Sequence, residues 1–541
     1  MNCSKLDVND IMINGKLFEF KEKLFESKKF IILYLILSLV LFLSTISMKN
    51  IAHPKFELIS LFVVLVLGIF CIAYYFMHNS DKEFYKVAFV VILCFGIVTS
   101  FIVPIVDVSD EVEHLTRAEI TSQGVLIPHW TGDDVGIDRL YNHTDGELSK
   151  ELNKNVGFET IESINFFNHN RENTVFETQN DTHKIDYTPF IRGSAFEQNA
   201  FFGYIPQAFG ILIAKLLDLN VIWMLWLGRI GNLVCYAFLI SLAIKITPKL
   251  KMPLFAISCI PITIYQAASV SIDSMIFGLG ILTIAYFIRL YLLKDKSIDI
   301  KEMVIFTLLC ALLGLCKLPY LAFIFLILFI PKENFKNEKY SLIMKILAIL
   351  IVSIIGISWS KYSTPTLMHS WRSSYNYVDS AAQLNYLITN PNQILNFLAH
   401  IFTIDLGYVV NGVFNFFNGK LGLHYQDHYV FITVVLQFFL MAVLFFYPSD
   451  CNFNLKTKLG ALFVLLVVYI GTCFIQLLTW SYVGQINLGV SIRYFIPLLA
   501  LIPIIVPHKN YFSQKEFDNY AMIFIISFMA ALILAFATKY Y

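Results

Sequence analysis

Charged residues are scarce in this chain. Only 15% of its 541 residues are Asp, Glu, Lys or Arg, whereas 57% are hydrophobic and 16% are aromatic. Soluble globular domains carry about 25% charged residues. The composition therefore excludes an ordinary soluble protein and indicates a polytopic membrane protein. With a formal net charge of +1, the chain also lacks the basic face that a nucleic acid requires, so no nucleic-acid partner is expected.

Reactive cysteine patterns and common catalytic motifs are missing as well. The nine cysteines include no CxxC pair, and most of them lie inside apolar runs. Such cysteines behave as small hydrophobic residues rather than as disulfides or metal ligands. The chain has no P-loop, no GxSxG and no HExxH sequence. Nucleotide-driven transport and the common hydrolase mechanisms are therefore without support.

Long apolar runs predict the membrane topology, because a helix needs about 20 apolar residues to cross a bilayer. Runs of about this length lie near 30–48, 57–76, 86–106, 222–246, 253–270, 273–292, 344–361, 429–447, 459–480 and 520–538. Shorter spans are predicted as a tight helical hairpin over 303–331, broken by Lys317 and Pro319, and at 494–507. The sequence thus predicts an all-α polytopic membrane protein with about 13 transmembrane helices.

Lysines in the short loops predict the orientation, because cytoplasmic loops are enriched in Lys and Arg. They precede the first span (Lys5, Lys16, Lys21, Lys23, Lys28, Lys29) and recur after every second span (Lys245, Lys249, Lys251; Lys294, Lys296, Lys301; Lys332, Lys336, Lys339; Lys456, Lys458). The N-terminus is therefore expected in the cytoplasm and the C-terminus outside. This assignment requires that two further apolar stretches, 200–217 and 392–417, lie on the outer face as juxtamembrane or re-entrant helices.

The predicted spans also divide the chain into regions. These are a cytoplasmic N-terminal segment (1–29), the first three transmembrane helices (30–106), a first extracytoplasmic loop with its juxtamembrane helix (107–221), transmembrane helices 4–9 (222–361), a second extracytoplasmic region (362–428) and transmembrane helices 10–13 (429–541). The stretch 107–199 is rich in Asn, Asp, Thr and Glu. That composition favours short helices packed on the membrane domain, together with a mobile part.

Ionisable residues gather at the predicted outer ends of the spans. An ionisable group at the bilayer centre costs about 2.5–3.5 kcal/mol, so such groups usually face a polar cavity or a partner. The residues at this level are Asp107, Asp110, Glu111, His114, Arg117, Arg229, Asp273, Lys317, His424, Asp427, Arg493 and Tyr494. Any single Lys or Arg among them is compatible with interfacial snorkelling. Both signs of charge at one level instead indicate a polar cavity.

Several interpretations of the stretch after the third span remain open. Asp110, His114 and Arg117 stand at i, i+4 and i+7, which places them on one face of a helix. A carboxylate at the mouth of a span, with other acids beside it, tends to have a raised pKa that suits a general base. Alternatively, Ser109 or Asp110 caps the helix and Glu113 completes a capping box, or Asp110 and His114 form an ordinary surface pair.

The same stretch also offers ligands for a divalent cation. Asp107, Asp110, Glu111 and His114 supply oxygen and imidazole groups, which suit Mg²⁺ or Mn²⁺. Their spacing is not diagnostic of a metal site.

Ordered motifs give a resemblance to a known family. They are SDEVEHLTRA (109–118), GYIPQAFGILIAKLLDLN (203–220), GRIGNLVCYAFLISLAIKITP (228–248), IPITIYQAASVSIDS (260–274), CKLPYLAFIFLILFIP (316–331), ITNPNQILNFL (388–398) and RYFIPLLALIP (493–503). This series resembles a bacterial membrane-protein family catalogued as domain-of-unknown-function family 2142, which is grouped with the GT-C glycosyltransferases. The family pattern D-E-x-x-H-x-x-R-A falls on Asp110, Glu111, His114, Arg117 and Ala118.

Two positions depart from the pattern of that family. Val108 and Ser109 stand where the family usually has proline before the acids. Ser491 and Ile492 replace the usual Gln-Gly before Arg-Tyr-Phe. The first departure affects the backbone that positions Asp110, and the second affects the conformation of the loop before Arg493.

The resemblance implies a GT-C-like fold and an inverting glycosyltransferase. Such an enzyme of the bacterial cytoplasmic membrane takes a sugar from a polyprenyl-phosphate donor on the extracytoplasmic face and transfers it to a cell-surface glycan or glycolipid. Direct displacement at the anomeric carbon needs a base and a positive charge for the departing phosphate. The catalytic candidates are Asp110, Glu111 and His114, and the substrate-binding candidates are Asp107, Arg117, Tyr204, Arg229, Asp273, Lys317, Arg493 and Tyr494.

Other functions remain open at this stage. A flippase or transporter of lipid-linked oligosaccharides would carry charges deep within many spans and show two-fold hydropathy symmetry, whereas these charges gather at one face. A polysaccharide polymerase or ligase also combines many spans with a large outer loop that contains arginines. A non-catalytic assembly partner with the same fold is the third alternative.

Overall fold

A computed structural model describes residues 26–46, 55–129, 157–192, 196, 199–293, 296–368, 379–413, 430–486, 490–507 and 512–541. Most of the predicted cytoplasmic N-terminal segment, loop residues 130–156, and the predicted outer residues His424 and Asp427 lie outside this part of the chain.

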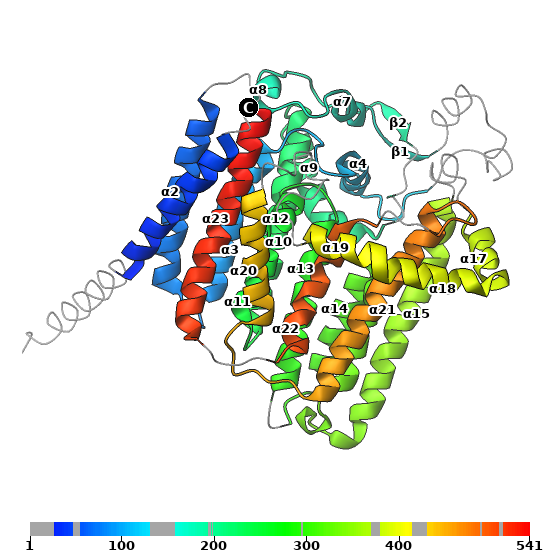
Figure 1. Cartoon of the computed structure of the whole chain (residues 1–541). Helices are drawn as coiled ribbons and strands as arrows, with labels where there is room; N and C mark the ends of the chain where they lie inside the picture. The colour runs from blue at the N-terminus through cyan, green and yellow to red at the C-terminus, as the bar shows by residue number, and fades with distance from the viewer. Residues whose placement is uncertain are drawn as a thin grey trace, which may run out of the picture.

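The described chain is an α-helical bundle whose long helices stand side by side (Figure 1). The long helices are Glu26–Ile46, α2 (Phe56–His78), α3 (Phe84–Ile102), α10 (Ile222–Ile246), α13 (Asp273–Leu292), α15 (Ser341–Met368), α21 (Leu455–Trp480) and α23 (Gln514–Tyr540). Shorter helices complete the bundle: α11 (Lys251–Ser258), α12 (Pro261–Ala267), α14 (Ile300–Cys316), η2 (Leu318–Phe329), α20 (Val430–Phe445), η7 (Ile492–Leu501) and α22 (Ile502–Ile505). The turns η3 (Lys332–Asn334) and η4 (Glu338–Tyr340) connect η2 to α15.

The helices confirm an all-α polytopic membrane protein. Within the described residues, nine helices are long and apolar enough to cross a membrane: the eight long helices above and the helical stretch Pro391–Val413, which the sequence predicts on the outer face instead. The predicted hairpin is present as α14 and η2, which pack on each other on either side of Lys317. The predicted span at 253–270 is divided between α11 and α12, because Pro261 begins a new helix. The number of about 13 crossings and the GT-C-like arrangement stay predictions.

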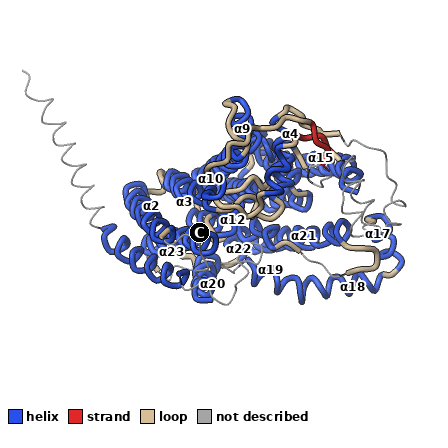
Figure 2. Tube along the Cα trace, turned by 90° about the horizontal axis from the view of Figure 1, so that it is seen from above, coloured by secondary structure: helices blue, strands red, loops and turns tan. Residues whose placement is uncertain are grey.

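The two apolar stretches predicted on the outer face are both helical. The first forms η1 (Phe201–Tyr204) and α9 (Ile205–Leu216). The second forms α18 (Pro391–His400), the π-helical turn η5 (Ile401–Asp405) and α19 (Leu406–Val413), with α17 (Ser380–Thr389) before it. Figure 1 shows α18 and α19 running across the upright helices, and Figure 2 shows them along one edge of the bundle.

Helix α9 approaches α10 very closely. A Cβ atom added at Gly210 would lie 2.0 Å from the carbonyl oxygen of Leu227, and one added at Gly231 would lie 2.3 Å from the carbonyl oxygen of Pro206. Only glycine permits this distance between two helix backbones. The contact fixes η1 and α9 against α10 and so positions Tyr204.

The first and the last described residues, Glu26 and Tyr541, lie at opposite ends of the bundle. Glu26, in the first described helix, pairs with Lys515 at the start of α23 (Oε1–Nζ distance 3.3 Å). At the other end of α23, the Tyr541 hydroxyl accepts a hydrogen bond from the Val175 backbone amide (3.2 Å). We call the end with Tyr541 and the stretch between α3 and α10 the loop end. The opposite end is the lysine end, where Lys251 pairs with Asp81 (3.7 Å).

The loop end contains a small sheet that the sequence did not predict. Strands β1 (Phe158–Ile161) and β2 (Pro189–Arg192) pair antiparallel, with Phe158 opposite Arg192. The short helices α4 (Glu111–Ser122), α7 (Ser163–His169) and α8 (Val175–Thr178) agree with the expected helical character of this region. Glu119 joins the parts: its carboxylate accepts hydrogen bonds from Thr160 of β1 and Lys215 of α9.

The orientation of the bundle can be tested by labelling with a membrane-impermeant thiol reagent. His183 at the loop end and Asp81 at the lysine end have side chains that are 76% and 91% exposed. In intact cells, a cysteine at His183→Cys is expected to react, whereas one at Asp81→Cys is expected to react only after permeabilisation, because the lysine-rich loops should be cytoplasmic. The unmodified chain controls for its native cysteines. The reverse pattern would contradict the proposed orientation.

Candidate active site

A cavity of about 190 Å³, lined by both polar and apolar side chains, opens among the helices near the loop end. Part of its lining consists of His114 of α4, Asp273 of α13, Lys317 between α14 and η2, and Arg493 and Tyr494 of η7. These five residues were all predicted from the sequence. We call this part of the lining the charged wall. The prediction of a polar cavity shared by both signs of charge is therefore consistent with the structure.

Arg493 is the centre of the charged wall. Its guanidinium is 4% exposed and contacts two carboxylates. One Nη atom donates to Asp110 Oδ2 (2.5 Å), and Nε lies 2.8 Å from Asp273 Oδ2. The other Nη donates more weakly to the carbonyl oxygen of Ser109 (3.4 Å). Because the planar fork of an arginine can bind two partners at once, Arg493 joins the first loop to α13.

Asp110 occupies the N-cap position of α4, but its side chain does not cap the helix. Its backbone is left-handed (φ 64°), and the side chain makes no cap hydrogen bond. Glu113 pairs with Arg192 of β2 (2.7 Å) instead of completing a capping box. The capping interpretation is therefore wrong. The Asp110 carboxylate, 38% exposed, does not line the cavity itself but pairs with Arg493, which does.

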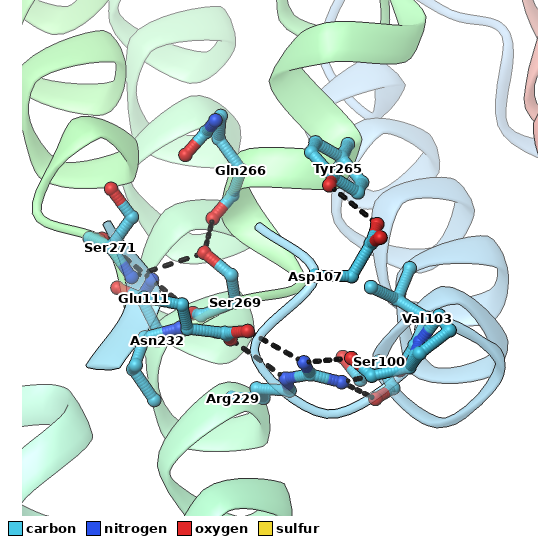
Figure 3. Close-up of polar contacts among 12 residues, drawn as sticks. Ser100, Val103, Asp107, Glu111, Arg229, Asn232, Tyr265, Gln266, Ser269 and Ser271 are labelled. Carbon is cyan, nitrogen blue, oxygen red and sulfur yellow. Dashed lines mark hydrogen bonds and ion pairs between the residues drawn. The ribbon is translucent and has the colours of Figure 1, made fainter. Parts of the chain in front are cut away.

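Glu111 points the opposite way and forms a closed ion pair with Arg229 (Figure 3). Its two carboxylate oxygens accept hydrogen bonds from Arg229 Nε (2.8 Å) and Nη2 (2.7 Å), and both side chains are fully buried. The remaining Arg229 donors reach the carbonyl oxygens of Ser100, Val103 and Pro104. Neither Glu111 nor Arg229 lines the cavity. Their contacts anchor the end of α3 and the start of α4 to α10.

Asp107 is also anchored away from the cavity. Its two carboxylate oxygens accept hydrogen bonds from the hydroxyls of Tyr265 (2.8 Å) and Tyr540 (2.6 Å). Burial raises the pKa of Asp107 above its ordinary value, although both hydrogen bonds oppose this shift. Figure 3 shows Asp107 beside Tyr265. The raised pKa expected of an acid in this stretch is thus found at Asp107, which does not line the cavity.

These contacts explain how Asp110 is presented without the usual preceding proline. The loop between α3 and α4 is fixed at Asp107 and again at Glu111, on both sides of Asp110. Val106 adopts a left-handed backbone (φ 47°), as Asp110 does, and such conformations persist only where the surroundings hold them. Of the three acids Asp107, Asp110 and Glu111, only Asp110 is directed to the charged wall.

Tyr204 and Arg117 form a second polar group with His114 of the charged wall, and neither of these two residues lines the cavity. His114 Nδ1 lies 2.8 Å from the Tyr204 hydroxyl, which also accepts a hydrogen bond from Asn199 (3.0 Å). Burial lowers the pKa of His114 to about 4, so its imidazole is neutral near pH 7. Arg117 is buried against Thr121 and the Asn199 carbonyl, and it does not line the cavity. The predicted common face of Asp110, His114 and Arg117 therefore contributes only His114 to the cavity lining.

Lys317 and Tyr494 are adjacent on the charged wall. The Lys317 ammonium lies 3.0 Å from the centroid of the Tyr494 ring. A cation held over an aromatic face is attracted by the ring quadrupole. Lys317 therefore adds a second positive group beside Arg493, both of them facing the cavity.

The predicted metal ligands are not assembled. Among the described residues, no group of three or more His, Cys, Asp or Glu side chains is placed to hold a metal ion. Asp107, Asp110, Glu111 and His114 each have a different partner: Tyr265 and Tyr540, Arg493, Arg229, and Tyr204. The metal-site hypothesis for these four residues is therefore wrong in this arrangement.

Sequence reasoning missed an uncharged part of the cavity lining. It consists of Trp359 and Ser363 of α15, together with Thr472, Gln476, Thr479 and Trp480 of α21. The missed signal is a polar pattern at i, i+4 and i+7 in α21, where Thr472, Gln476 and Thr479 interrupt an apolar helix. We call this part of the lining the neutral wall, because these six residues carry no charge.

The helices and the cavity define a multi-pass α-helical membrane protein with a polar cavity near one end. The model of the family described as predicted membrane protein (DUF2142) matches residues 93–502. The chain belongs to this family. No curated protein matches the chain, and no solved structure does.

Proposed function

We propose that this protein is an integral-membrane, inverting glycosyltransferase with a GT-C-like fold. It takes a sugar from a polyprenyl-phosphate donor and transfers it to a cell-surface glycan or glycolipid at the extracytoplasmic face of the bacterial cytoplasmic membrane. The observation that carries this proposal is Arg493, which lies at the cavity between Asp110 and Asp273. A carboxylate and cations at one cavity are the groups that sugar transfer from a lipid phosphate requires.

The proposed reaction is a single displacement at the anomeric carbon. Asp110 accepts the proton of the acceptor hydroxyl while that oxygen forms a bond to the anomeric carbon. The bond between the anomeric carbon and the donor phosphate oxygen breaks, and its electron pair leaves with the polyprenyl phosphate. Arg493 and Lys317 stabilise the negative charge of that leaving group. Direct displacement inverts the configuration of the sugar.

The ion pairs suggest how the donor prepares the base. In the structure described here, Arg493 holds Asp110 through one Nη atom and faces Asp273 through Nε. A donor phosphate that binds the Nη atoms competes with Asp110, whereas Asp273 keeps its position on Nε. Binding of the donor thus releases the Asp110 carboxylate toward the acceptor. Asp273 acts as the fixed counter-ion that holds the guanidinium in place.

The remaining polar residues of this region have positioning roles in the proposed mechanism. Glu111 and Arg229 satisfy each other, so we assign them to positioning of the loop rather than to proton transfer. Neutral His114 is held by Tyr204 and lines the cavity, where it orients the acceptor by hydrogen bonding. Asp107 and Arg117 contribute through the loop and α4 rather than by contact with the substrate.

Analysis of surface glycans tests the proposed function. A deletion strain is expected to lack one sugar substituent of a surface glycan or glycolipid. The wild-type chain should restore it, whereas Asp110→Asn expressed to the same level in the membrane should not. A flippase would instead depend little on a single carboxylate, and its deletion would leave the lipid-linked sugar on the cytoplasmic side. An unchanged glycan composition in the deletion strain would contradict the proposal.

A further inference from the structure

The neutral wall contains polar side chains that have no role in the mechanism proposed for the charged wall. Thr472 and Gln476 stand one helical turn apart on α21, and Trp359 and Ser363 stand one turn apart on α15, all facing the same cavity. Polar side chains are costly on helices that cross a membrane, and they usually mark a ligand pathway. Here they line the same cavity as Arg493 and Lys317.

Thr472 supplies an independent observation. Its side chain is 3% exposed, and its hydroxyl has no hydrogen-bond partner among the described residues. A threonine in a helix usually satisfies its hydroxyl at the carbonyl four residues earlier, as Thr479 does at Ile475 (2.9 Å). A buried polar group without a partner costs free energy. The Thr472 hydroxyl therefore lies at the cavity with its hydrogen-bonding capacity unused, as expected where a ligand completes the site.

The chemistry of this wall selects one class of ligand. The indole rings of Trp359 and Trp480 offer large flat apolar faces. Thr472, Gln476 and Ser363 offer hydroxyl and amide groups that can donate and accept hydrogen bonds. A pyranose ring combines an apolar face of C–H bonds with a rim of hydroxyl groups, and it matches both. The wall has no cation to pair with the carboxylate of an acidic sugar.

We infer that the neutral wall binds the pyranose ring of a neutral hexose or N-acetylhexosamine carried by the donor. The inference rests on the proposed function and identifies the class of sugar transferred. The charged wall then receives the phosphate of the same donor, and the anomeric carbon lies between the two walls, near Asp110. The neutral wall sets sugar specificity, and the charged wall sets affinity for the phosphate.

Binding of two lipids to the purified full-length protein separates the two walls. One probe is a short-chain polyprenyl phosphate, and the other is the same lipid carrying a single neutral hexose, with glucose, galactose and N-acetylglucosamine tried in turn. The wild-type protein is expected to bind one of the glycosylated lipids more tightly than the bare phosphate. Thr472→Val should reduce that advantage by roughly 2- to 12-fold, the value of one neutral hydrogen bond. Trp359→Ala should reduce it roughly tenfold.

For Thr472→Val, the melting temperature and the lipid preference together distinguish a role in binding from a role in stability. Valine has nearly the same shape, and the hydroxyl that it replaces makes no hydrogen bond within the described chain. The variant should therefore melt at the same temperature as wild type or higher, while its preference for the glycosylated lipid falls. Phe463→Leu, at an exposed position of α21, and Trp223→Phe, at a tryptophan of α10 outside the cavity, should leave binding of both lipids unchanged.

The outcomes distinguish failure of the inference from failure of the proposed function. If the protein binds both lipids equally, or if Thr472→Val and Trp359→Ala keep the full preference for the sugar, the neutral wall is not the sugar site. Equal loss of both lipids in Trp359→Ala would also overturn the inference and assign that tryptophan to membrane anchoring. If neither lipid binds to the wild-type protein, the proposed function itself fails.

Discussion

Replacement of Asp110 by Asn is expected to reduce sugar transfer by roughly 10²–10⁴-fold, the contribution of a general base. Asparagine keeps the size of the side chain and tolerates the left-handed backbone found at this position (φ 64°), but it cannot accept the proton. Binding of polyprenyl phosphate should stay the same or become tighter, because the carboxylate that competes for Arg493 is gone. Purified protein with lipid-linked sugar gives transfer and binding separately.

Neighbouring acids provide the controls for this experiment. Glu113→Gln removes a carboxylate that pairs with Arg192 and does not line the cavity, and it should transfer normally. Glu111→Gln leaves Arg229 buried without its counter-charge, which costs about 3–5 kcal/mol of stability, so it should lower the melting temperature. Normal transfer by Asp110→Asn would remove this residue from catalysis. If folded Glu111→Gln were inactive while Asp110→Asn stayed active, the base would be Glu111.

Removal of the Arg493 charge is expected to weaken binding of polyprenyl phosphate and to lower transfer by roughly 10²–10³-fold, as for loss of one preorganised charge-stabilising group. The simple Arg493→Ala variant would leave Asp273, 3% exposed, without its ion-pair partner, and the cost of about 3–5 kcal/mol could unfold the protein. The double variant Arg493→Gln with Asp273→Asn removes one positive and one negative charge together, so it leaves the net charge of the site unchanged. It therefore separates loss of phosphate binding from loss of folding.

Two further variants make this prediction specific. Asp273→Asn keeps the guanidinium and should still bind polyprenyl phosphate. Arg493→Lys should restore only part of the activity, because an ammonium group cannot contact the phosphate and Asp273 with a planar fork. Binding can be measured by isothermal titration in detergent, and folding by the melting temperature. Wild-type phosphate binding in the folded double variant would exclude Arg493 from the donor site.

The helical architecture was predictable because each apolar run is a local property of the sequence. The hairpin at Lys317 and the helical stretches near 200–217 and 392–417 follow from short-range patterns of apolar and polar residues. The β1–β2 pair was not predicted, because its strands are only four residues long and are separated by α7 and α8. A short strand depends on its partner for stability and gives little signal alone.

The charged residues of the site were predictable, but their pairings and the neutral wall were not. Asp110 and Arg493 could both be named from charge and position, yet they are 383 residues apart in the chain. Spacing along a helix predicts neighbours within a few turns, so it suggested a cap and a metal site that do not form. For the same reason, the sequence could not show that the neighbouring acids have different partners. Glu111 pairs with Arg229 of α10, and Asp107 accepts hydrogen bonds from Tyr265 and Tyr540.

The order of Glu111 and Arg229 along the chain has a consequence for biogenesis. Arg229 is fully buried two turns into α10, a predominantly apolar helix that also contains Asn232 and Lys245. Insertion of an arginine into a membrane helix is costly, about 2.5–3.5 kcal/mol at the bilayer centre. Glu111 is synthesised first and is already beyond α3 when α10 leaves the ribosome. As α10 enters the bilayer, neutralisation by Glu111 lowers the cost of inserting Arg229. Insertion of α10 thus becomes coupled to the folding of the loop that presents Asp110.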